Sequence, residues 1–319
     1  MISKKTVFIL GAGAHIPYGF PSGKELIRNV VAQLRVAQNH SDLNLRALPQ
    51  RSGVNSQYVQ QQNIARFIDS LSQAGQASID TFLNANQHMG GYDVLGKVGV
   101  AQTLLQSEAN FLTAKTHEKN TQYDWFEYLF EKMADGIGKV EHFFRDNHIS
   151  FITFNYDRLL EFKLFNSLKN SFNIASDQDV LNMVSAIPIH HVYGSLGEFE
   201  PSRFGDLNQW ESSFKSINTI YEVSAGQSDA VNSAISALNE AEKICLLGFG
   251  FHHENVSLLD LPRVIEEQSG NIAACRHGVT DEEIRRVVFS NRIRQSKLHI
   301  APEQMKALET LRNLPVFDS

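Results

Sequence analysis

The chain has little cysteine and no excess of basic residues, and each shortage excludes a class of protein. Its 319 residues include two cysteines, Cys245 and Cys275, too few for a four-thiolate zinc ribbon or the disulfide framework of a small secreted protein. The formal net charge is −6 at pH 7, whereas a surface that follows nucleic-acid phosphates needs an excess of Lys and Arg. We therefore expect neither a zinc ribbon nor a direct nucleic-acid partner.

Long apolar runs are also missing. No segment approaches the roughly 18–20 apolar residues that a membrane-spanning helix needs, and the run that follows Lys4 and Lys5 is too short for a signal peptide. With 42% hydrophobic residues, the chain can nevertheless bury a large core. We therefore expect no membrane partner and take the cytoplasm as the default location.

Short apolar runs predict the strands of a parallel sheet, because they end in turn signals and alternate with segments of helical spacing. Such alternation is typical of a doubly wound, Rossmann-like α/β fold with helices on both faces of the sheet. The predicted strands are TVFIL at 6–10, ISFITFNYD at 149–157, AIPIHHVYGSLG at 186–197, KICLLGFGF at 243–251 and, more weakly, KLHIA at 297–301.

One domain with a large helical insertion accounts for the order of these segments. From Ile64 to Asn147 the apolar spacing is helical throughout, and no strand pattern interrupts it. We therefore predict a single α/β domain over residues 1–319, with the helical insertion at approximately 24–148. The core that carries the sheet is expected at approximately 1–23 and 149–302.

The first predicted strand runs directly into the glycine-rich turn Gly11-Ala12-Gly13-Ala14. Glycines at such a strand end let the backbone turn tightly and approach a pyrophosphate, whose charge the amides and the next helix end would meet. The turn departs from the full dinucleotide fingerprint, because Ile16 stands where the third glycine belongs. The turn predicts a phosphate site, with a purely structural turn as the alternative.

Two further strand ends carry polar side chains. The segment TFNYD places Asn155 and Asp157 where they could hold sugar hydroxyls or a carboxamide, with an Asx-type turn as the alternative. The segment IHHVYG places His190, His191 and Tyr193 before a glycine, and imidazole is the usual general base near neutral pH. A structural role for these histidines stays open. Their spacing, with that of GFGFHHEN, supplies no tetrahedral ligand set, so we predict no metal site.

Taken in order, four loops resemble the sirtuin-like NAD-consuming proteins, specifically the bacterial branch found in anti-phage defence. The matching segments are VFILGAGAHIPYGFPSG, ITFNYDRLLE, HHVYGSLG and KICLLGFGFHHEN, and SIDTFL and DWFEYLF also look like that branch. The resemblance spans roughly residues 6–260 and is most specific in the first two segments. It implies a single sirtuin-like domain that binds NAD.

The resemblance also implies roles for individual residues. Asn155 would hold the nicotinamide ribose and the attacking water, and Asp157 would fix the carboxamide. The glycine-rich turn would cradle the pyrophosphate, and residues 248–250 would face the adenosine half. The binding positions are Gly11, Ala12, Gly13, Ala14, Pro21, Ser22, Thr153, Tyr193, Gly194, Gly248, Phe249 and Gly250.

Two positions depart from the family pattern. His15 stands where relatives commonly have serine, and Tyr193 stands directly before the glycine, where the family has its general base. Because side chains alternate along a strand, His191 and Tyr193 are expected to point the same way. His191, two residues before Tyr193, could then be the catalytic base, or Tyr193 could merely bind the ligand. Which of His190, His191 and Tyr193 faces the ligand stays open.

The resemblance implies an NAD+ glycohydrolase that releases nicotinamide and ADP-ribose, with NAD+ as substrate and no required cofactor. The deacetylases of the family carry a zinc ribbon that this chain cannot build, which leaves water as the expected acceptor. Such a protein would deplete NAD as a defence effector, triggered by a separate sensor or activator protein, by a nucleotide signal or by assembly into a homo-oligomer. The alternative is a catalytically inactive sensor or scaffold that binds NAD or ADP-ribose. An oxidoreductase is a third reading, which Ile16 disfavours.

Overall fold

A six-stranded sheet forms the centre of the protein. All of its strands are parallel and lie in the order β3-β2-β1-β4-β5-β6. This is the strand order of doubly wound dinucleotide-binding folds, so the predicted fold class is confirmed. The computed structural model describes residues 1–39, 54–114, 124–225, 228–267, 272–275, 279–288, 298–302 and 305–317. The strands are β1 (Thr6–Leu10), β2 (Ile149–Thr153), β3 (Ile189–His191), β4 (Lys243–Leu247), β5 (Ile272–Ala274) and β6 (Leu298–Ile300).

The central strands of the sheet are formed by apolar runs of the sequence. Every residue of β1 and β4 is buried, because β1 lies between β2 and β4 and both faces of the sheet are covered. Thr6 of β1 lies opposite Ile149 of β2 on one side and Lys243 of β4 on the other. The sequence did not predict β5, because two of its three residues are alanine, which is depleted in strands.

Side chains of β1 alternate between two hydrophobic clusters, one on each face of the sheet. Val7 and Ile9 belong to the first cluster, and Phe8 and Leu10 belong to the second. Helices of the first cluster are α1 (Gly23–Asn39), α3 (Gln61–Gln73), α4 (Ile79–Ala85), α5 (Tyr92–Thr113), α10 (Trp210–Ser216), α11 (Ile220–Ala225), α12 (Asp229–Glu240), α13 (His253–Leu258), α14 (Leu261–Glu267) and α15 (Asp281–Val288). Helices of the second are α6 (Trp125–Ala134), α7 (Val140–Asp146), α8 (Leu159–Ser171), α9 (Asp177–Ser185) and α16 (Ala307–Asn313).

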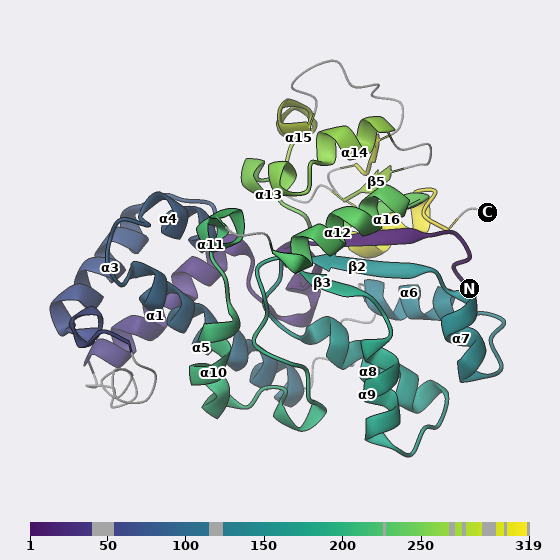
Figure 1. The fold of residues 1–319 in the computed structure, drawn as a ribbon, viewed down its shortest axis with the longest axis horizontal. Coiled ribbons are helices and arrows are strands. Elements are labelled where there is room, and N and C mark those ends of the chain that lie inside the picture. The colour runs from purple at the N-terminus through teal and green to yellow at the C-terminus, as the bar shows by residue number, and fades with distance from the viewer. Residues whose placement is uncertain are drawn as a thin grey trace.

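The helical segment between β1 and β2 contributes to both clusters. Helices α1, α3, α4 and α5 pack on one another and lie to one side of the sheet, at the left of Figure 1. Helices α6 and α7 instead pack with the second cluster, where α6 contacts α16. We call α1, α3, α4 and α5 the helical lobe. Within the described ranges, no helix is both long and apolar enough to cross a bilayer.

A buried ion pair ties the helical lobe to the loop that follows β2. Nη2 of Arg158, at the start of α8, donates to Oε2 of Glu108 on α5 over 2.6 Å, and neither side chain is more than 1% exposed. Glu108 also accepts hydrogen bonds from the backbone amides of Arg158 (3.1 Å) and Gly205 (3.0 Å). Helix α5 of the helical lobe therefore anchors the loop at residues 154–158 through Glu108.

Candidate functional site

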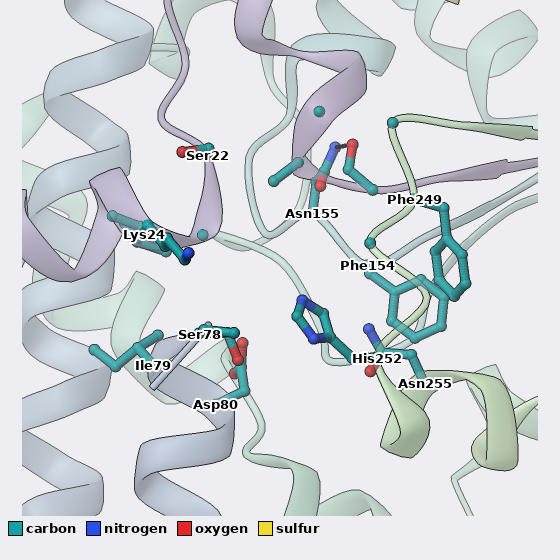
Figure 2. Close-up of a pocket in the computed structure, with 18 of the residues that line it drawn as sticks. Ser22, Lys24, Ser78, Ile79, Asp80, Phe154, Asn155, Phe249, His252 and Asn255 are labelled. Carbon is teal, nitrogen blue, oxygen red and sulfur yellow. Dashed lines mark hydrogen bonds between the residues drawn. The ribbon is translucent and has the colours of Figure 1, made fainter. Parts of the chain in front are cut away.

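A cavity of about 940 Å³ opens at the carboxyl ends of β1, β2 and β4. It lies where the strand order reverses, which is the position at which doubly wound sheets bind their ligands. Its walls come from the loop after β1 and the start of α1, the start of α4, the loop after β2, Tyr193, and the segment from β4 into α13 (Figure 2). The volume is at the upper end of the range for small-molecule sites.

The glycines after β1 and β4 allow these two loops to touch backbone to backbone. The amide of Gly11 donates to the carbonyl of Leu247, and that of Gly13 to the carbonyl of Gly248, each over 3.0 Å. A Cβ atom on Gly11 would lie 2.5 Å from the Gly248 oxygen. Gly248 has φ +59°, and its Cβ would lie 1.9 Å from the Ala14 nitrogen. Close packing of the two loops therefore requires glycine at these positions, whatever ligand binds.

This packing limits how the glycine-rich turn can meet a phosphate. The amides of Gly11, Gly13 and Ala14 all donate to backbone carbonyls. Ala12 is the position of the turn whose amide has no such bond in the described part of the chain, and it lines the cavity. The turn therefore presents one amide to a ligand, where the family resemblance suggested a cradle of several.

A buried polar cluster at the cavity joins the loops after β1 and β2. Nδ1 of His15 lies 2.8 Å from Oδ1 of Asp157 and 3.1 Å from Nδ2 of Asn155. The three side chains are 2%, 5% and 5% exposed, in that order. The Asn155 amide also donates to the Gly11 carbonyl over 3.3 Å, and Thr153 Oγ1 accepts from the Asn155 backbone amide over 3.0 Å. His15 was not placed in the site by the sequence analysis. The one sequence feature that could have done so is the histidine at a position where the family commonly has serine.

His191 is held away from the cavity by two hydrogen bonds. Its Nδ1 donates to the Asn155 carbonyl over 3.0 Å, and its Nε2 lies 2.7 Å from Oε1 of Glu161. Burial lowers the pKa of His191, but the Glu161 carboxylate and the hydrogen bonds raise it by more than burial lowers it. The pKa of His191 is therefore above its usual value. The two hydrogen bonds of His191 position the Asn155 backbone, and His191 is not among the residues that line the cavity.

Tyr193 does line the cavity, but the strand does not carry it there. Because β3 ends at His191, the alternation expected to place both side chains on one side does not extend to Tyr193. Gly194 has φ +74°, which turns the chain directly afterwards. The Tyr193 hydroxyl donates to Oδ1 of Asn255 over 2.7 Å, and burial raises the pKa of Tyr193 far above its usual value. Tyr193 is therefore a neutral hydrogen-bond donor.

A second polar group lies across the cavity, at the start of α4. Ser78 caps this helix by accepting from the Thr81 amide over 3.2 Å, and the cap orients Asp80 in the first turn. Burial raises the pKa of Asp80 to about 6, although the hydrogen bond from the Tyr156 hydroxyl opposes this shift. Figure 2 shows Asp80 and His252 pointing into the cavity from facing walls.

Aromatic rings form the apolar wall of the cavity. The ring centroid of Phe249 lies 5.3 Å from that of Phe154 and 5.1 Å from that of Phe251. Phe251 has φ +51°, a conformation that is strained for a bulky residue and that occurs most often at functional sites. This wall offers a flat surface against which a heteroaromatic ring can pack.

The charged residues of the cavity are mostly acidic. Among the described residues that line the cavity, Lys24 in the first turn of α1 is the one lysine or arginine, so a phosphate would be placed near this end of the cavity. An acidic lining favours a ligand that also carries positive charge. The carboxylates are those of Glu25, Asp80, Asp157, Glu254 and Glu283.

The cavity brings together most of the residues that the sequence singled out. In the described part of the chain, no group of three or more His, Cys, Asp or Glu side chains is placed to hold a metal. Of the predicted site residues, Gly11, Ala12, Gly13, Pro21, Ser22, Asn155, Asp157, Tyr193, Gly248, Phe249 and Gly250 line the cavity, whereas Ala14, Thr153, His191 and Gly194 do not.

No protein-family model matches this chain, and no curated protein matches it either. The likeness to sirtuin-like proteins therefore rests on the segments quoted above. The activity and partners that this likeness implies are proposals.

Proposed function

We propose that this chain is an NAD+ glycohydrolase that cleaves NAD+ to nicotinamide and ADP-ribose. The observation that carries the proposal is the meeting of the loops after β1, β2 and β4 in one cavity, with His15 in contact with both Asn155 and Asp157 there. Dinucleotides bind at this position of a doubly wound sheet, across the point where the strand order reverses.

The walls of the cavity complement the parts of NAD+. The wall of Phe154, Phe249 and Phe251 suits a heteroaromatic base. Lys24 and the Ala12 amide supply positive potential for the diphosphate, and the acidic lining suits the cationic nicotinamide ring. The absence of an acidic ribose ligand some 20 residues beyond the glycine turn argues against redox use of the dinucleotide.

The same groups support cleavage of the nicotinamide–ribose bond. Departure of nicotinamide leaves positive charge on the ribose, which a buried carboxylate such as that of Asp157 would stabilise. The Asn155 side chain is placed to orient a hydroxyl group or a water molecule beside it.

The decisive assay is nicotinamide release from NAD+ by the purified chain, alone and with any protein that co-purifies with it. Asn155→Ala is expected to lower release at least about 100-fold, because it removes a group that positions the reactants. Asn170→Ala is the matched control, since Asn170 is exposed on α8 away from the cavity. Equal release by wild type and Asn155→Ala would contradict the proposal.

A second function, binding of NAD or ADP-ribose without cleavage, is favoured by one observation. Tyr193 occupies the position of the family base, and its raised pKa and the bond that its hydroxyl donates to Asn255 do not suit it to take a proton from water. NAD+ binding by calorimetry, with no nicotinamide released in any preparation, would make the chain a sensor or scaffold subunit.

The biological role that we propose is NAD depletion in anti-phage defence, with a homo-oligomer or a separate activator protein as the trigger. Total cellular NAD after expression is the measurement. It is expected to fall with the wild type and to stay constant with Asn155→Ala. A fall with both would assign the loss of NAD to another cause.

A further inference from the structure

We propose that His15 is the general base of this site, a role that rests on the proposed NAD+ hydrolysis. His15 lies between the two short helical turns that follow β1, and it lines the cavity while being 2% exposed. Its ring packs edge-on against those of Tyr18 and Phe20, with centroids 6.4 Å and 6.0 Å away. The imidazole is thus held in one orientation before any ligand binds.

The contact with Asp157 decides which ring nitrogen carries the hydrogen. A carboxylate only accepts hydrogen bonds, so Nδ1 of His15 donates to Asp157 Oδ1 over 2.8 Å. In this tautomer Asn155 Nδ2, itself a donor 3.1 Å from Nδ1, makes no hydrogen bond to the ring. The backbone amide of Leu159 donates to the same oxygen over 3.1 Å and fixes the carboxylate. In this tautomer Nε2 carries a lone pair, and it has no hydrogen bond in the described part of the chain. A base oriented by a carboxylate in this way is the arrangement of activated catalytic histidines.

Asn155 completes a site for one water molecule. Because the Gly11 carbonyl only accepts, the Asn155 amide nitrogen faces it over 3.3 Å, and the amide oxygen remains for another donor. A water molecule that donates one hydrogen to this oxygen and the other to His15 Nε2 would have its own lone pairs free. Such a water is placed for attack on an atom bound in the cavity.

The other histidines near the cavity are less suited to this role. His191 has both ring nitrogens engaged, with Glu161 and the Asn155 carbonyl, and it does not line the cavity. His252 does line the cavity, but a Cβ on Gly250 would lie 2.9 Å from its Nε2, so this nitrogen lies against the loop backbone. In the described part of the chain, no carboxylate is hydrogen-bonded to His252.

The proposed hydrolysis forms one bond to C1′ of the nicotinamide ribose and breaks one. The water oxygen forms a bond to C1′ of the nicotinamide ribose as the bond from C1′ to the pyridinium nitrogen breaks, and that bonding pair stays with nicotinamide. His15 Nε2 takes a proton from the water, and Asp157 stabilises the resulting imidazolium. Release of this proton to solvent returns the base to its starting form. The products are nicotinamide, ADP-ribose and one proton.

The test compares His15→Gln with two matched variants, His190→Gln and His252→Gln, in nicotinamide release and in NAD+ affinity by calorimetry. His15→Gln is expected to lower kcat by ~10²–10⁴-fold, the usual contribution of a general base, with NAD+ affinity within about threefold of wild type. His190 does not line the cavity, so His190→Gln is expected to keep wild-type kcat. If the glutamine variant does not fold, His15→Asn takes its place in the same comparison.

Chemical rescue separates a base from a structural residue. Imidazole added to His15→Ala is expected to restore release in proportion to its concentration, which a merely structural histidine would not show. Release by His15→Gln within threefold of wild type, or a loss confined to His252→Gln, overturns the assignment of His15 while leaving the hydrolase proposal standing. NAD+ bound but never cleaved by the wild type overturns both.

Discussion

Removal of the Glu108 carboxylate is expected to destabilise the protein more than any change in a surface ion pair. Glu108 accepts from Nε (3.2 Å), Nη2 (2.6 Å) and the backbone amide of Arg158 (3.1 Å), and from the amide of Gly205 (3.0 Å). Glu108→Ala leaves a guanidinium that is 1% exposed without its counter-charge. Breaking a buried pair in this way costs ~3–5 kcal/mol in the free energy of unfolding.

Urea unfolding followed by tryptophan fluorescence measures this cost. Glu240→Ala is the matched control, since Glu240 pairs with Lys5 at the surface, where both side chains are more than half exposed. Its removal is expected to change the free energy of unfolding little, because solvent screens the pair. The joint replacement Glu108→Met with Arg158→Met is expected to recover most of the loss, because it leaves no buried charge.

Two results would refute this reasoning. A loss below ~1 kcal/mol for Glu108→Ala would show that the guanidinium finds solvent or another partner. A joint variant as unstable as Glu108→Ala would show that the cost comes from lost packing and not from an unpaired charge. Because Arg158 follows the loop that carries Asn155 and Asp157, we also expect Glu108→Ala to weaken NAD+ binding.

Two further predictions concern the cavity wall. Gly248→Ala is expected to cost roughly 2–4 kcal/mol in thermal or urea unfolding, because the new Cβ overlaps the Ala14 amide; Gly19→Ala, at φ +84° with nothing within 4 Å, is the control and should cost about 1 kcal/mol. Equal losses would mean that the loop contact adds nothing. The folded pKa of Asp80 is raised from 3.8 to about 6, so its contribution to stability is present below pH 3.8 and is lost as the pH rises through about 6. Asp80→Asn should therefore gain stability relative to wild type between pH 4 and pH 7 in urea unfolding, and a relative loss over this range would contradict the assigned shift.

Local pattern was enough to predict the fold class and much of the cavity. Continuous apolar runs indicated β1, β2 and β4, because strands covered on both faces have no polar side. Glycines and polar residues directly after these strands indicated a ligand site, because carboxyl ends of parallel strands open to one edge of the sheet. Strand β5 was not predicted because two of its three residues are alanine, which is depleted in strands.

Which side chains lie together in the cavity could not be predicted from local pattern. His15 and Asp157 are 142 positions apart, and their contact depends on β1 and β2 lying side by side in register. His191 was a reasonable base until Glu161 of α8 was found beside it, and strand alternation could not reveal this partner. Strands, turns and the chemistry at each strand end depend on neighbours along the chain, so the amino-acid pattern predicts them. Burial and hydrogen-bond partners depend on neighbours in space, so the contact of His15 with Asp157 and that of His191 with Glu161 could be seen only in the folded protein.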